Sequence, residues 1–159
     1  MDLLPLFKWM EASALAKMVG QSEYLSAALG VTHLLALTIF AGSILVVDVR
    51  LLGSGMSKTP LARIARDAQP WLIGSFLMLL ITGFPQVVSL AMKQYYSPFF
   101  WWKMAGIVVG LIFTFTLRRS LTQAEEGRVN PLVLKAAGLF SILLWTGVTV
   151  GARLIGLLS

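Results

Sequence analysis

The residue best suited to chemistry in this chain is His33, the single histidine among 159 residues. It lies inside an uncharged apolar run from Leu25 to Val47. An imidazole can bind a metal ion or transfer a proton near neutral pH. Ionisable side chains inside a membrane are costly to bury, so they often mark a functional site. The structural alternative is that the ring makes a hydrogen bond between two helices.

Three further polar side chains interrupt the later apolar runs. Gln86 lies late in the second run, Lys103 near the start of the third and Arg153 late in the fourth. Together with His33 they would form one site, in which the two cations bind anionic groups of a ligand. The alternative for Lys103 and Arg153 is that they extend to the lipid headgroups, as long cationic side chains near helix ends do.

These residue types fit three ligands. Haem b would place its iron on His33 and its propionates on the two cations. A quinone head group needs one histidine and a second donor, so it fits too. Because there is no second histidine, the sixth haem ligand would be a methionine such as Met104, a lysine, water or a group from another chain, unless the position is open. The third option is copper on His33 with Met92 or Met104, since thioethers suit Cu(I).

The composition places these residues in a membrane. The chain is 57% hydrophobic and 13% charged, about half the charged fraction of a typical soluble domain. We therefore expect an integral membrane protein with a single domain, residues 1–159. Cysteine is absent, which excludes disulfides and thiolate metal sites. The net charge of +6 comes from basic residues between apolar runs, a topology signal rather than a nucleic-acid site.

Four apolar runs predict an all-α fold, a bundle of four transmembrane helices. A span of about 20 residues crosses a hydrocarbon core of about 30 Å. A short helix is expected to run up into the second span, and Pro85 should kink that span. No phosphate-loop, nucleophile-elbow or zinc-helix motif occurs in the sequence, which leaves open whether the protein is an enzyme. The expected spans are residues 25–47, 71–92, 99–117 and 132–157.

Residues 3–19 are expected to form a short interfacial helix before the first span. The helix would either lie on the membrane surface or pack on the end of the bundle. The apolar side chains of this segment recur at helical spacing; they are Leu3, Phe7, Met10, Ala14 and Met18.

The positive-inside rule sets the orientation. The connections after the first and third spans carry four Lys or Arg each, against two in the N-terminal segment and one in the middle connection. We therefore expect both charged connections in the cytoplasm and both termini outside, in the periplasm, for a multi-pass protein of the bacterial inner membrane. His33 then lies about 12 Å below the outer edge. At the inner end, Asp48 and Arg50 are expected to form a structural ion network with Arg66 or Asp67.

Two glycine pairs, Gly106/Gly110 and Gly147/Gly151, allow close helix approach. With the small size of the chain, they support a second hypothesis, a non-catalytic accessory subunit of a larger membrane complex, for instance one that transfers electrons. The partners would be the lipid bilayer and other membrane subunits or further copies of this chain, not nucleic acid.

Several stretches resemble a bacterial family of four-helix inner-membrane proteins of unknown function. The resemblance runs from about residue 25 onward, and its most specific part is the D-x-R-L-L-G stretch. In that family an acidic residue often precedes the histidine, whereas here the stretch is Gly30-Val31-Thr32. The matching stretches are His33-Leu34-Leu35-Ala36-Leu37, Asp48-Val49-Arg50-Leu51-Leu52-Gly53, Trp71, Ile81-Thr82-Gly83, Phe99-x-x-x-Lys103-Met104 and Gly151-Ala152-Arg153-Leu154-Ile155.

More distantly, the layout is similar to the membrane-bound haem-binding protoporphyrinogen oxidase of bacteria and to the copper resistance protein D group. In the oxidase family a first-span histidine and a third-span lysine are the functional pair. This similarity implies that His33 and Lys103 act together and raises the expectation of haem.

Overall fold

The computed structural model of the chain describes residues 3–54, 58–124 and 127–158, with side chains up to residue 152. Within these ranges the regular structure is entirely helical, which confirms the predicted all-α class. The helices are α1 (Leu4–Ala12), α2 (Ala14–Gln21), α3 (Glu23–Leu51), α4 (Leu61–Ser89), α5 (Ala91–Tyr96), α6 (Pro98–Phe113), a π-helical turn (Thr114–Arg118), α7 (Arg119–Gln123) and α8 (Pro131–Leu158).

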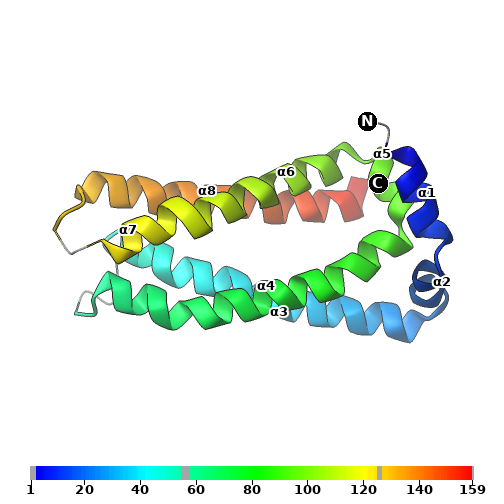
Figure 1. Cartoon of the computed structure of the whole chain (residues 1–159), viewed down its shortest axis with the longest axis horizontal. Coiled ribbons are helices and arrows are strands. Elements are labelled where there is room, and N and C mark those ends of the chain that lie inside the picture. The colour runs from blue at the N-terminus through cyan, green and yellow to red at the C-terminus, as the bar shows by residue number, and fades with distance from the viewer. Residues whose placement is uncertain (1–2, 55–57, 125–126, 159) are drawn as a thin grey trace.

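Four segments are long and apolar enough to cross a membrane, as predicted. They lie lengthwise beside one another (Figure 1). Helix α3 packs along α4, α6 packs along α8, and contacts between α3 and α8 join the two pairs. The chain is therefore a multi-pass membrane protein. The four segments are Glu23–Leu51, Leu61–Ser89, Pro98–Gln123 and Pro131–Ala152.

The short helix predicted to run up into the second span does so without a break, and the two form one continuous helix, α4. This helix contains both Pro70 and Pro85. A proline removes one helical hydrogen bond and can kink a helix without ending it. Helix α4 curves toward its C-terminal end, where Pro85 lies (Figure 1).

The N-terminal segment is two helices rather than the predicted one. Ser13 is extended (φ −66°, ψ 156°) and separates them. Its hydroxyl donates to the Met10 carbonyl (2.6 Å) and accepts from the backbone N–H of Ala16 (3.2 Å), so it caps α2. The predicted apolar stripe therefore fails beyond Ser13: Ala14 and Met18 are exposed, and α2 buries other side chains.

Both short helices lie across one end of the bundle, so the alternative in which they pack on that end describes them. Phe7 of α1 is buried against Ala91 and Phe100. Both termini lie at this end (Figure 1), which we call the terminal end. The other end, which we call the charged end, holds the last turn of α3, the first turns of α4 and α8, and α7 (Figure 1). The predicted connection after the second span is also helical, as α5.

The two glycine pairs have different surroundings. A Cβ on Gly106 would lie 2.7 Å from Val148 Cγ2, and one on Gly110 would lie 2.9 Å from the Trp145 ring. This pair therefore sets the close approach of α6 to α8. A Cβ on Gly147 or Gly151 would meet nothing within 4 Å among the described residues.

Candidate functional site

His33 points from α3 toward α4 and makes a hydrogen bond there. Its Nδ1 lies 2.8 Å from Thr82 Oγ1, and the Thr82 hydroxyl donates to the Met78 carbonyl at 2.7 Å. A hydroxyl has only one proton to donate. When the Thr82 proton lies on the Met78 carbonyl, the hydroxyl accepts from the His33 Nδ1–H, and in that neutral tautomer Nε2 keeps its lone pair.

The helix contact beside the ring depends on a glycine. A Cβ on Gly83 would lie 3.0 Å from His33 Cε1. Gly83 thus makes room for the imidazole in the contact between α3 and α4, and the half-buried ring is held on two sides.

Gln86 occupies the next turn of the same contact. Its Nε2 donates to the Thr82 carbonyl at 2.9 Å and approaches the Leu29 carbonyl, four residues before His33, at 3.4 Å. The structure therefore brings Gln86 and His33 to one interface. Sequence reasoning did not identify Thr82 as their shared neighbour, although its spacing of four residues from Gln86 places both on one helical face.

Lys103 of α6 is half-buried and close enough to His33 for the two groups to interact electrostatically. Its Nζ lies 5.9 Å from the centroid of the Phe100 ring. Met104 follows Lys103 directly and is 38% exposed. Because successive helical residues are about 100° apart, the two side chains leave α6 in different directions.

The other predicted ligands remain predictions. Arg153 lies on α8, but its side chain is outside the described residues. Met92 packs against the Phe7 cluster at the terminal end. Within the described part of the chain, no three His, Asp or Glu side chains gather where they could hold a metal ion. A metal at His33 would thus have to bring most of its own ligands.

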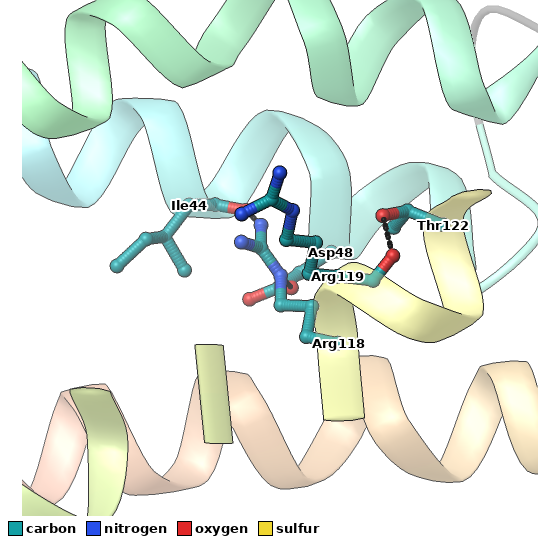
Figure 2. Close-up of polar contacts among 5 residues, drawn as sticks. All are labelled: Ile44, Asp48, Arg118, Arg119 and Thr122. Carbon is teal, nitrogen blue, oxygen red and sulfur yellow. Dashed lines mark hydrogen bonds and ion pairs between the residues drawn. The ribbon is translucent and has the colours of Figure 1, made fainter. Parts of the chain in front are cut away.

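A second polar contact lies at the charged end and corrects a prediction. Asp48 pairs with Arg118 rather than with Arg66 or Asp67. Arg118 Nε donates to Asp48 Oδ1 at 3.0 Å, and Nη2 donates to the Ile44 carbonyl at 2.9 Å. Figure 2 shows the Arg118 side chain directed at this stretch of α3. Asp48 is 0% and Arg118 6% exposed, so the pair is buried.

A third helix completes this contact. Ser141 of α8 is 0% exposed and interacts with the Asp48 carboxylate. The geometry falls short of a full hydrogen bond, because Asp48 Oδ2 and Ser141 Oγ both lack a partner within the described ranges. Gly138, one turn before Ser141, lets α8 approach: a Cβ there would lie 3.0 Å from the Asp48 carbonyl oxygen. Asp48 thus joins the first, third and fourth spans.

Comparison with known proteins identifies a family but no function. No curated protein and no solved structure significantly matches this chain, so neither comparison supports a relationship to the haem-binding oxidase or the copper resistance group. A family described as a family of unknown function, DUF6644, matches residues 6–158, in agreement with the resemblance noted in the sequence. The chain belongs to this family of unknown function, DUF6644.

Proposed function

We propose that this protein binds a redox cofactor at His33, in the terminal-end half of a bundle in the bacterial inner membrane, and that the cofactor is haem b. The observation that carries the proposal is the 2.8 Å contact between His33 Nδ1 and Thr82 Oγ1; with the Thr82 proton on the Met78 carbonyl, Nδ1–H is the donor and Nε2 keeps its lone pair. Histidines that bind metals almost always donate their other ring N–H to an oxygen acceptor in this way.

The residues present fit haem better than a bare metal ion. Haem supplies four nitrogen ligands of its own, so it needs only one axial side chain from this chain. Lys103, whose charge acts on His33, offers a cation for a propionate, and Gln86 adds an amide one turn away. When bound, haem would supply one-electron redox chemistry. The residues of this chain would fix the imidazole tautomer and orient the ring.

For the alternative ligand, a quinone, the same geometry suits the reduced form, the quinol. Nε2 of His33 would accept a proton from one hydroxyl, and the Lys103 ammonium would donate to the oxygen at the other end. Copper on His33 and Met104 would need further ligands, because the described residues offer no cluster of three His, Asp or Glu side chains. Metal analysis of the purified protein tests that option.

Absorption spectroscopy tests the haem proposal. We expect the protein, purified in mild detergent and titrated with haem b, to develop a Soret band with a 1:1 end point. His33→Ala should lose the band, and His33→Gly should regain it when imidazole is added. Because His33 is the only histidine, no other residue can supply imidazole ligation.

Thr38→Val is the matched control for these variants. Thr38 lies on the same helix, and its exposed hydroxyl bonds only to the Leu34 carbonyl, so the spectrum should not change. If the wild type bound no haem, or if His33→Ala bound it unchanged, the haem proposal would be wrong. Quinone co-purifying with the wild type and not with His33→Ala would support the quinol alternative instead.

The second candidate is an accessory subunit of a larger membrane complex, and one observation favours it. Gly147 and Gly151 form a small-residue face on α8 that no described residue covers, and such faces allow a helix of another chain to approach closely. Gly147→Leu should shift the protein to a smaller species in native gels of solubilised membranes. Gly74→Leu, at an isolated glycine that is also uncovered, is the control. Equal migration of both variants and the wild type would remove this support.

A further inference from the structure

A cavity of about 370 Å³ opens beside the Asp48–Arg118 pair at the charged end. It lies between α3, α4 and the end of the third span, and its volume falls in the range of about 300–1,000 Å³ usual for ligand pockets. Among the described residues, the lining includes three arginines and no aspartate or glutamate. Its principal polar residues are Arg66, Gln69, Thr114, Arg118, Arg119 and Gln123.

Among the described residues, the charged side chains that line this cavity are all positive, and Arg118 is the one that is paired, with Asp48. Arg66 and Arg119 are exposed, and neither has an ion-pair partner among the described residues. An anionic ligand would therefore be attracted here.

Thr114 supplies an independent sign of a ligand. It is 4% exposed, it lines the cavity, and its Oγ1 has no hydrogen-bond partner in the part of the chain that the structure describes. Leaving a buried hydroxyl unpaired is unfavourable, so such groups usually have a partner. Thr114 also begins the π-helical turn, and π-helical turns occur frequently at functional sites.

We propose that this cavity binds a phosphate group. Arg66 and Arg119 would donate to its oxygens, since the guanidinium fork matches phosphate geometry. Thr114 would contribute its free hydroxyl. Asp48 would hold Arg118 in position at the inner wall. The phosphate belongs either to the headgroup of an anionic lipid or to a soluble phosphate compound.

The position of the cavity fits a lipid headgroup in particular. It lies between the charged-end parts of three spans, the depth at which headgroups of the cytoplasmic leaflet would lie under the predicted orientation. Basic pockets between membrane helices on that side bind anionic headgroups. The site is separate from His33, so a test of the haem proposal does not decide this one, and the reverse is also true.

Lipid binding measured by native mass spectrometry in a neutral detergent tests the proposal. We expect phosphatidylglycerol or cardiolipin to be retained in preference to phosphatidylcholine. Arg66→Gln with Arg119→Gln should weaken this binding about tenfold or more, because it removes the charge-assisted hydrogen bonds of two guanidinium groups to the phosphate.

Lys58→Gln with Arg63→Gln is the matched control. It removes two exposed charges from the same end without altering the cavity lining, so binding should change by no more than about twofold. Equal losses in the two double variants would show that only general surface charge attracts the lipid and would overturn the proposal. So would the absence of any preference for anionic lipid together with no binding of phosphate.

Inorganic phosphate and Thr114→Val complete the test. The ligand is a soluble phosphate compound if inorganic phosphate binds to the wild type without displacing bound lipid, and if the variant with Arg66→Gln and Arg119→Gln no longer binds phosphate. Thr114→Val should weaken phosphate or lipid binding and leave thermal stability without ligand equal or higher, because it removes an unpaired buried hydroxyl. Binding that equals the wild type in Thr114→Val would overturn the proposed ligand set.

Discussion

The two polar contacts inside this bundle, His33–Thr82 in the terminal-end half and Asp48–Arg118 at the charged end, are built differently. The first is a hydrogen bond between groups on consecutive spans, and it leaves one ring nitrogen unused. The second is a buried ion pair between residues 70 positions apart, braced by a backbone carbonyl. A ligand can be added at Nε2 of His33, whereas the Asp48–Arg118 pair satisfies most of its own charge.

This difference separates positions that hold the fold from positions that are free to bind. Asp48 connects three spans, so replacing it should lower the stability of the fold. His33 connects two spans that already pack along most of their length, so its removal should be felt mainly as lost binding. At the charged end, binding belongs instead to Arg66, Arg119 and Thr114, which border the ion pair but take no part in it.

The largest expected effect is from breaking the ion pair. Arg118→Met should lower the free energy of unfolding by about 3–5 kcal/mol, because it leaves the Asp48 carboxylate buried without a counter-charge. Thermal unfolding in detergent measures the change. Adding Asp48→Leu to Arg118→Met should restore much of the loss, since the double variant buries no charge.

Arg63→Gln, which removes an exposed arginine at the same end, should leave the melting temperature nearly unchanged. If Arg118→Met had the same melting temperature as this control, the Asp48–Arg118 pair would not be the contact that stabilises the fold.

A smaller effect is expected from crowding the approach of α8 to Asp48. Gly138→Ala places a Cβ 3.0 Å from the Asp48 carbonyl oxygen and 3.1 Å from Leu51 Cβ. Because backbone cannot give way cheaply, we expect a loss of about 1–3 kcal/mol. The matched substitution Gly147→Ala, on an uncovered face of the same helix, should cost little. Equal melting temperatures for the two alanine variants would contradict the close approach at Asp48.

The smallest effect on stability is expected at the His33 contact. Thr82→Val removes the acceptor of Nδ1–H and should lower the free energy of unfolding by only about 0.6 kcal/mol, an average value for a hydrogen bond between membrane helices. The haem titration should change more than the melting temperature, with weaker binding or a shifted Soret band, because the ring loses its fixed tautomer.

Thr38→Val should change neither quantity. A loss of stability in Thr82→Val as large as that in Arg118→Met would mean that His33 is a structural residue, and the comparison would fail.

Much of the fold could be predicted from composition. Spans at 25–47 and 132–157 lie inside the observed α3 and α8, because a membrane helix is marked by a local run of apolar residues. The helix boundaries were less predictable. Nothing in the apolar spacing of residues 3–19 shows that Ser13 ends one helix and caps the next, and Pro70 did not separate α4 into two parts.

The candidate sites divide in the same way. His33, Gln86 and Lys103 could be identified because each is a polar residue in an apolar run. Thr82 could not, because threonine is common in membrane helices and only its distance from Nδ1 gives it a role. The interaction partner of Asp48 was predicted wrongly, since Arg66 and Asp67 are nearer in the sequence than Arg118.

The sequence by itself determined the membrane environment, the all-helical class and the gathering of basic residues at one end, because these depend on the local transfer of side chains between water and lipid. Only the tertiary structure decided which face of each helix meets its neighbour. The rotation of α3 turns His33 to Thr82 and Asp48 to Arg118, and the π-helical turn lies where Arg118 meets α3. Those choices depend on packing among four helices at once, which no single segment encodes.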